Sequence, residues 1–97
     1  MLRLIFLGTL LITASACARP HADGAELVVA KGCIACHGTS GKATAPSYPN
    51  LDGQWERYLR LQLMAYRSGE RQNGIMNGMA ATLTDEEIRA LAAYYGR

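Results

Sequence analysis

The sequence Cys-Ile-Ala-Cys-His at residues 33–37 is the feature that most constrains how this chain of 97 residues can fold. Two cysteines and a histidine in five positions can bind zinc, carry out thiol redox chemistry or hold a haem. A structural zinc site needs four ligands, and outside the motif the sequence offers only Cys17 and His21. A thioredoxin-type C-x-x-C belongs with a β-α-β pattern, which this sequence lacks. Covalent haem attachment is the remaining interpretation.

The spacing of the motif suits a single haem. Thioether bonds from Cys33 and Cys36 would fix the porphyrin to the chain, and the adjacent His37 would lie beneath the iron as its proximal ligand. A plain disulfide between the two cysteines would leave the histidine without a role. We therefore predict one covalent haem c, with its iron bound by His37.

Length and charge are compatible with this prediction. A chain of this length forms one domain, and its formal net charge of +2 is close to zero. A nucleic-acid-binding protein would show a basic patch or stripe. The sequence contains no such cluster, so we expect no nucleic-acid partner. The core of so small a domain is marginal, and a bound cofactor would stabilise it.

Residues 1–17 have the pattern of a secretory signal peptide. Arg3 is followed by an apolar run from Leu4 to Ile12 and then by small residues, the order of charged start, apolar segment and cleavage site. The run is shorter than the roughly 20 residues that cross a bilayer, which disfavours an uncleaved anchor. We expect export to the periplasm, with residues 18–23 as a polar tether and residues 24–97 as the folded domain.

Cys17 directly follows Ala14-Ser15-Ala16. These small residues suit a general signal peptidase. The same order before a cysteine also resembles a bacterial lipobox, although lipoboxes usually carry Leu in place of Ala14. Cys17 is the odd cysteine of the chain, and an unpaired thiol in an oxidising compartment needs an explanation. We expect lipidation of Cys17 and attachment to a membrane; ordinary cleavage, giving a soluble protein, is the alternative.

The first part of the mature chain is predicted to be a helix followed by a loop. Asp23 can cap a helix with Glu26 three residues later, as in a capping box. Gly32 breaks the apolar pattern just before the motif. Residues 38–50 are rich in Gly, Ser, Thr and Pro, which is typical of a loop.

A second amphipathic pattern lies within residues 52–69. Its apolar residues at helical spacing are Trp55, Tyr58, Leu59, Leu63 and Tyr66. Asp52 is a candidate cap, Gly69 marks the end, and Met64 is expected in the core. Residues 70–81 carry two glycines and two methionines and are expected to be loop or broken helix.

The clearest helix is predicted within residues 84–95. Thr84 and Glu87 match a capping box, and the acidic residues between them suit the positive end of the helix dipole. The predicted apolar face is Ile88, Leu91, Ala92 and Tyr95, and Gly96 follows it. No alternating pattern is long enough for a strand. The predicted fold class is therefore all-α.

Three sequence blocks together resemble a known family. GCIACHG, YPNLDGQ and GERQNGIMNGMAATLTDEEIRALAAYY are similar to blocks of bacterial class I cytochromes c, in particular the small periplasmic ones and single halves of the di-haem ones. The resemblance covers residues 24–96. It implies a cytochrome c fold, in which helices pack around one covalently bound haem c and the first and last helices cross near a haem edge.

The family also implies a methionine as the sixth iron ligand, from the loop before the last helix. The family pattern resembles Met-x-x-x-Ala before the LTDEE block, and Met76 occupies that position. We therefore predict Met76 as the axial ligand. Met79 is the rival, and a core-filling role for both methionines is a further alternative.

A second implication of the resemblance concerns the orientation of the histidine. His37 is expected to donate its outer ring N–H to a backbone carbonyl, which orients the ring and tunes the iron. In the family a proline after the motif supplies this carbonyl, and Pro49 fits the separation better than Pro46. Trp55, Gln54 and Arg71 are candidate partners of the haem propionates.

Function follows from the expected ligands. An iron bound by His and Met has no open position for a substrate, so we expect an electron-transfer protein and not an enzyme. The expected role is a one-electron carrier in the bacterial cell envelope, between a quinol-oxidising complex or dehydrogenase as donor and an oxidase or reductase as acceptor. One alternative is the haem c subunit of a periplasmic oxidoreductase complex. Another is a ligand-binding or sensor domain, which would need an open sixth position.

Overall fold

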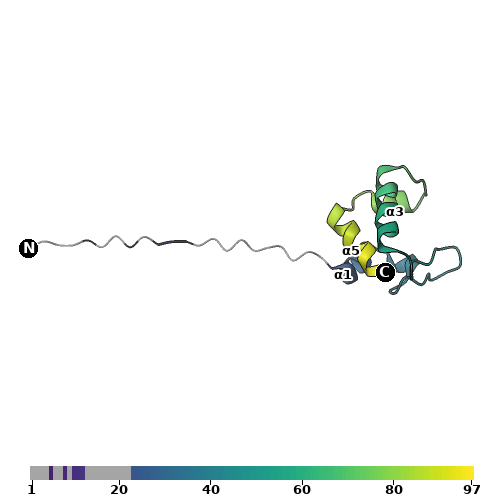
Figure 1. Cartoon of the computed structure of the whole chain (residues 1–97), viewed down its shortest axis with the longest axis horizontal. Coiled ribbons are helices and arrows are strands. Elements are labelled where there is room, and N and C mark those ends of the chain that lie inside the picture. The colour runs from purple at the N-terminus through teal and green to yellow at the C-terminus, as the bar shows by residue number, and fades with distance from the viewer. Residues whose placement is uncertain (1–4, 6–7, 9, 13–22) are drawn as a thin grey trace, which may run out of the picture.

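The computed structural model describes Ile5, Gly8, residues 10–12 and residues 23–97. Its helices are α1 (Gly24–Ala30), α2 (Ile34–His37), α3 (Glu56–Ser68), α4 (Met76–Ala80) and α5 (Asp85–Tyr95) (Figure 1). The described residues contain no strand, which confirms the predicted all-α class. None of the helices in this part of the chain is long and apolar enough to cross a membrane. Most of the predicted signal peptide, including Cys17, and residues 18–22 of the tether lie outside the described residues.

α1 starts where the sequence predicts. The Asp23 carboxylate accepts a hydrogen bond from the Glu26 backbone N–H at 2.8 Å. A helix of seven residues is too short to be stable alone in water, so α1 depends on burying Leu27 and Val28 in the core. The remaining buried apolar side chains are Leu59, Ala80, Leu83, Ile88, Leu91, Ala92 and Tyr95.

α1 crosses α5 at close range because position 24 is glycine. A Cβ at Gly24 would lie 2.6 Å from the Ala90 carbonyl oxygen and would also overlap the Tyr94 side chain. In a close-packed interior a larger residue would push the two helices apart. At the same crossing, Lys31 forms an ion pair with Glu87 at 3.2 Å. The predicted contact between the first and last helices is therefore confirmed, and Figure 1 shows it beside the C-terminus.

The capping box of α5 is present. The Thr84 hydroxyl accepts from the Glu87 N–H at 3.1 Å, and the Glu87 carboxylate accepts from the Thr84 N–H at 3.0 Å. That backbone hydrogen bond, helped by Lys31, holds the pKa of Glu87 below its ordinary value of 4.5. The predicted apolar face is buried along its length: Ile88, Leu91, Ala92 and Tyr95.

α3 begins at Glu56, so the predicted cap at Asp52 is wrong. Trp55 occupies the N-cap position with extended backbone, and the Gln54 side chain accepts a hydrogen bond from the Trp55 N–H at 3.0 Å. Asp52 lies in the preceding turn, where its own N–H donates to the Gly41 carbonyl at 3.1 Å. This long-range contact fixes Asp52 in the loop, one turn before the helix starts.

Several apolar side chains of this region lie outside the core, among them Trp55 and Met64. Trp55 is 62% exposed, and the Arg97 guanidinium lies 4.7 Å from its ring centroid. Met64 is 40% exposed, so the prediction that it packs in the core is wrong. Helical spacing marks an apolar residue but does not establish that another element covers it. Gly69, with a left-handed φ of 84°, ends α3 as predicted.

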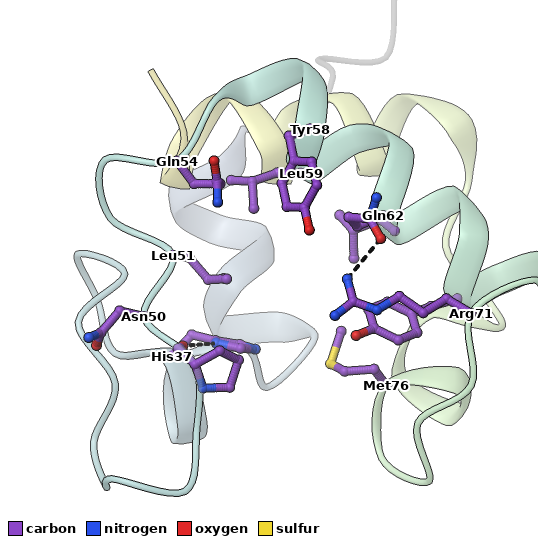
Figure 2. Close-up of a pocket in the computed structure, with 12 residues that line it drawn as sticks. His37, Asn50, Leu51, Gln54, Tyr58, Leu59, Gln62, Arg71 and Met76 are labelled. Carbon is purple, nitrogen blue, oxygen red and sulfur yellow. Dashed lines mark hydrogen bonds between the residues drawn. The ribbon is translucent and has the colours of Figure 1, made fainter.

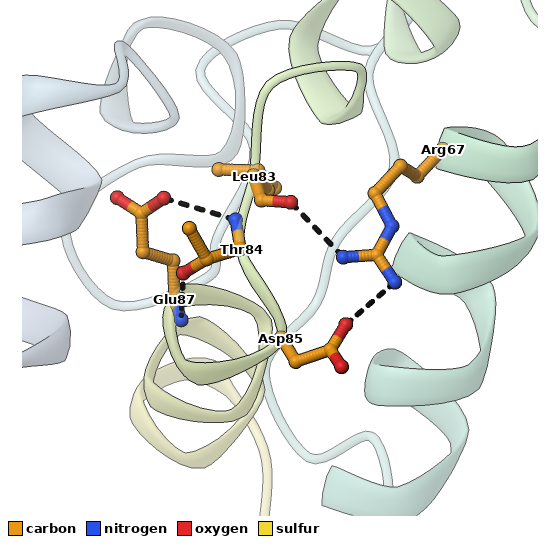
Figure 3. A network of polar contacts seen from close by, with 5 residues as sticks. All are labelled: Arg67, Leu83, Thr84, Asp85 and Glu87. Atoms are coloured by element: carbon orange, nitrogen blue, oxygen red, sulfur yellow. Dashed lines mark hydrogen bonds and ion pairs between the residues drawn. The ribbon is translucent and has the colours of Figure 1, made fainter.

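Arg67 joins the end of α3 to the start of α5. One guanidinium nitrogen donates to the Leu83 carbonyl at 3.0 Å, and the other pairs with the Asp85 carboxylate at 2.6 Å (Figure 3). α4 lies between Arg67 and Leu83 in the sequence and packs on α3. The contact therefore limits how far α4 can move away from α3.

Candidate haem site

A cavity lies between α2, the loop after it, α3 and α4. Its lining combines a histidine, a methionine, apolar side chains and a polar group: His37, Pro49, Asn50, Leu51, Gln54, Tyr58, Leu59, Gln62, Leu63, Tyr66, Arg71 and Met76. Figure 2 shows His37 and Met76 on opposite sides of this cavity. Of the site residues predicted from the sequence, His37, Pro49 and Met76 thus meet around one space.

His37 is buried, and its hydrogen bond determines which ring nitrogen is free. Its Nδ1 lies 3.0 Å from the Pro49 carbonyl oxygen (Figure 2). Because a carbonyl oxygen only accepts hydrogen bonds, Nδ1 must carry the ring proton. The lone pair of Nε2 is then available, and neutral imidazole is the form of histidine that binds metals. The Tyr95 ring packs edge-on against the histidine at a centroid separation of 6.3 Å.

The two candidate methionines occupy different places. Met76 is partly buried and lines the cavity opposite His37. Met79 is 37% exposed and does not line the cavity. Its methyl group lies beside Gly32, where a Cβ would meet it at 3.6 Å. Both side chains come from the short helix α4. They are three positions apart, so they leave the same side of the helix about one turn apart along its axis, where they contact different neighbours.

Cys33 and Cys36 lie on the turn that leads into His37 and are not joined to each other by a disulfide. Both are partly buried, and neither lines the cavity. The His37 N–H donates to the Cys33 carbonyl at 2.9 Å, so the motif forms a single helical turn with Cys33, Cys36 and His37 on one side of it. Burial raises the pKa of the Cys33 thiol, and a backbone hydrogen bond and nearby Lys31 only partly offset this.

Two tyrosines of α5 hold the loop that follows the motif. The Tyr95 hydroxyl donates to the Gly38 carbonyl at 2.8 Å, and the Tyr94 hydroxyl donates to the Thr39 carbonyl. Gly38 has a φ of +73°, and a Cβ there would overlap the Lys42 carbonyl, so glycine is required. Burial raises the pKa of Tyr95 to about 12. The sequence pattern placed Tyr95 on an apolar face and gave no signal for its hydroxyl contact.

One wall of the cavity is polar. The Arg71 guanidinium donates to the Gln62 side chain at 2.8 Å and lies 4.8 Å from the Tyr66 ring centroid. Gln54 lines the cavity as well, whereas Trp55 does not. A guanidinium beside apolar walls suits a ligand that carries an acidic group on a hydrophobic body.

Asn73 and Asn77 do not line the cavity, but they bond the segment that carries Met76, and the sequence prediction missed them. The Asn73 side-chain oxygen accepts from the backbone N–H groups of Ile75 and Met76, both at 3.0 Å. The Asn77 side chain bonds both the chain before α4 and the end of α3. Asn73 lies three positions before Met76, the first residue of α4, and an asparagine close to the start of a helix is a recognised capping signal. This signal could have located Asn73 but not the longer contacts of Asn77.

The comparisons with known proteins give the family. The family model described as Cytochrome c matches residues 21–95. The chain therefore belongs to the cytochrome c family, and its resemblance to bacterial class I members is confirmed. It binds haem c covalently and is a haem electron carrier.

The individual relatives differ in length. Cytochrome c-554(548) of Halomonas halodenitrificans is 52% identical over 66 residues, which are 65% of this chain and 80% of that protein. Cytochrome c4 of Pseudomonas aeruginosa is 38% identical and covers 90% of this chain. The crystal structure of reduced cytochrome c4 from Pseudomonas stutzeri has a TM-score of 0.65 at 35% identity and covers 78% of this chain. The chain spans 45% of the first c4 and 48% of the second, so it corresponds to about half of each.

The cavity fits the cofactor of this family. An aromatic macrocycle needs apolar walls, which Leu51, Leu59 and Leu63 supply. Its iron needs donors above and below, and the available Nε2 of His37 faces Met76 across the cavity. Two unpaired cysteines lie on the adjoining turn. The donor set and the shape of the space therefore agree with a haem c.

Proposed function

We propose that this protein is a mono-haem, one-electron carrier whose iron is bound on one face by His37 and on the other by Met76, with Cys33 and Cys36 as the thioether residues. The observation that supports this best is the position of His37 and Met76 on opposite sides of one cavity, with Nδ1 of the histidine already engaged by Pro49. The haem supplies an iron that changes oxidation state by one electron. Met79, outside the cavity lining, is the weaker candidate.

Each protein group has a defined task in this proposal. The Pro49 carbonyl holds the Nδ1 proton of His37 and so keeps the ring in one tautomer and one orientation. The thioether of Met76 is a soft, neutral donor that favours the reduced iron. Burial of His37 and the leucine walls keep water from that side. With His37 and Met76 as its ligands, the iron would have no open position for a substrate.

The location of the carrier is proposed from its N-terminal sequence. Residues 1–17 have the order of an export signal, residues 18–23 would form a tether, and residues 24–97 the haem domain in the periplasm. We propose that Cys17 carries the lipid that attaches the protein to a membrane. The mature protein should then be recovered with membranes, whereas a Cys17→Ser variant should be recovered in the soluble periplasmic fraction. Recovery of both in the soluble fraction would exclude the lipid anchor.

The partners are proposed as redox proteins of the cell envelope: a quinol-oxidising complex or a dehydrogenase as donor, and an oxidase or reductase as acceptor. A second candidate function is the haem subunit of an oxidoreductase complex. It is supported by a relative from Thiomonas intermedia named thiosulfate dehydrogenase electron acceptor, which is 42% identical over 81 residues. This chain spans 37% of that relative. Co-purification of a stoichiometric catalytic subunit would favour the second function over a freely diffusing carrier.

Carbon monoxide tests whether protein ligands occupy both axial positions of the iron. A reduced haem with both axial positions bound should show no change in its absorption spectrum on addition of carbon monoxide. The Met76→Ala variant, with one position open, should bind the gas readily and provides the positive control. Rapid binding by the unaltered protein would contradict the carrier function and favour a ligand-binding or sensor domain.

A further inference from the structure

Asn77 follows the proposed ligand Met76 in the sequence, and its side chain forms hydrogen bonds to residues outside its own helix. Its side-chain nitrogen donates to the Tyr66 carbonyl at 3.0 Å and to the Arg71 carbonyl at 2.8 Å, and its side-chain oxygen accepts from the Asn73 N–H at 2.7 Å. Both amide protons and the amide oxygen are therefore used. One side chain ties α4 to the end of α3 and to the loop between them.

The Asn73 side chain only accepts hydrogen bonds, whereas the Asn77 side chain also donates them. Its side-chain oxygen accepts from the N–H groups of Ile75 and Met76, both at 3.0 Å, and its backbone carbonyl accepts from the Asn77 N–H at 3.1 Å. The side-chain contacts of Asn73 use only an oxygen acceptor, which is the usual arrangement at the start of a helix. Asn73 thus binds the backbone of Met76 directly, and Asn77 fixes Asn73 and α4 to α3.

We propose that Asn77 is a positioning residue for Met76, which holds the methionine sulfur at the distance from the iron that keeps the sixth position closed. This inference rests on the proposed ligation by Met76. The network reaches Met76 through its own N–H, and the Tyr66 and Met76 side chains both line the cavity. Loss of the two donors of Asn77 would release α4 from α3 on the side of the cavity opposite His37.

The difference between the two asparagines allows the same substitution to give opposite results. In Asn77→Asp, a carboxylate replaces the amide nitrogen and faces the carbonyl oxygens of Tyr66 and Arg71, which repel it. In Asn73→Asp, the oxygen acceptor is kept, and a negative charge at the start of a helix is favourable. Both variants add the same charge near the haem, so the pair separates lost hydrogen bonds from electrostatics.

The experiment measures binding of imidazole to the oxidised holoprotein, because imidazole must displace the methionine. Asn77→Asp is expected to bind imidazole about ten-fold more tightly than the unaltered protein, equivalent to about 1.4 kcal/mol, the scale of one or two lost hydrogen bonds. Its weak far-red absorption band, which arises from methionine sulfur on ferric iron, is expected to decrease. Asn73→Asp is expected to keep the band and to bind imidazole within about two-fold of the unaltered protein.

A general loss of stability is separated from positioning by a second variant and a second measurement. Asn77→Ala removes the donors without adding charge and should shift imidazole binding in the same direction. Thermal unfolding of each variant is followed in parallel, because a purely structural role would lower stability without changing the band of the folded protein. Equal imidazole affinities for Asn77→Asp, Asn77→Ala and Asn73→Asp would overturn the positioning role.

The outcome also distinguishes the two proposals. If the far-red band is present in the unaltered protein, absent in Met76→Ala and unchanged in the Asn77 variants, Met76 ligation stands and the positioning role is overturned. If the unaltered protein lacks the band and binds imidazole as tightly as Met76→Ala, ligation by Met76 is wrong, and the positioning role is overturned with it.

Discussion

His37 and Met76 lie on the two sides of one cavity and are held there by different means. The His37 side is fixed by backbone carbonyls and by the tight crossing of α1 and α5. The Met76 side is fixed by side-chain amides in the connection from α3 to α4, mostly at exposed residues. We conclude that changes on the first side should lower global stability, and changes on the second should alter iron ligation first.

The largest effect is expected at the helix crossing. Gly24→Val places a branched side chain against the Ala90 carbonyl and should lower the free energy of unfolding of the holoprotein by about 3 kcal/mol. Ala25→Val, at the adjacent exposed position, is the control and should have little effect. Denaturant unfolding measures both. Equal losses for the two variants would show that the crossing is not the tight contact described above.

A smaller loss is expected when the hydroxyl that holds the loop after the motif is removed. Tyr95→Phe leaves the Gly38 carbonyl without its partner and should destabilise the protein by about 1–2 kcal/mol. Tyr94→Phe removes the corresponding bond to Thr39 at an exposed residue, where water can replace it, and should lose less. A larger loss for Tyr94→Phe than for Tyr95→Phe would reverse this ranking of the two contacts.

The Met76 side is tested at Arg67, which ties α3 to the segment before α5 (Figure 3). Arg67→Ala should lower the free energy of unfolding by about 1 kcal/mol, since the hydrogen bonds to Leu83 and Asp85 are charge-assisted but partly exposed. It should also increase the affinity of the oxidised protein for imidazole, because α4 would be held less tightly against α3. Arg57→Ala, an exposed position on the same helix, should change neither measurement. An unchanged imidazole affinity in Arg67→Ala would show that this contact does not help to position Met76.

The smallest effect concerns acid stability. The pKa of Glu87 is lowered in the folded protein, so the contribution of this carboxylate is present above about pH 4.5 and is lost as the pH falls through the lowered pKa. Glu87→Gln should remove this part of the loss of stability at acidic pH. At neutral pH it should lower the free energy of unfolding by less than about 1 kcal/mol. Stability measured from pH 7 to pH 3 should be unaffected by Glu70→Gln, at an exposed turn position. If stability falls equally from pH 7 to pH 3 in Glu87→Gln and in the unaltered protein, the Glu87 carboxylate does not stabilise the fold as described.

The sequence predicted the features that depend on neighbours in the chain. The capping box at Thr84, the cap at Asp23 and the end of α3 at Gly69 each follow from residues within one helical turn. The motif at residues 33–37 is visible in the sequence itself, and the family resemblance named the proline whose carbonyl lies against His37. Such local signals are readable because a few residues determine the backbone conformation.

The errors and omissions concern contacts between distant segments. Asp52 could cap a helix by its identity, but the Gly41 carbonyl holds it in a loop. Met64 lies within the amphipathic segment, yet it is 40% exposed and does not belong to the core. The bonds of Asn77 to Tyr66 and Arg71 depend on how the α3–α4 connection folds. No periodicity or motif encodes these partners.

The measurement that tests the central claim most directly is the far-red absorption of the oxidised holoprotein in three forms: unaltered, Met76→Ala and Met79→Ala. With His37 and Met76 as the ligands, the band should be present in the unaltered protein and in Met79→Ala and absent in Met76→Ala. Loss of the band in Met79→Ala with its retention in Met76→Ala would contradict the assignment. It would mean that α4 turns by about 60° and shifts by about three residues along its axis to present the other sulfur to the iron.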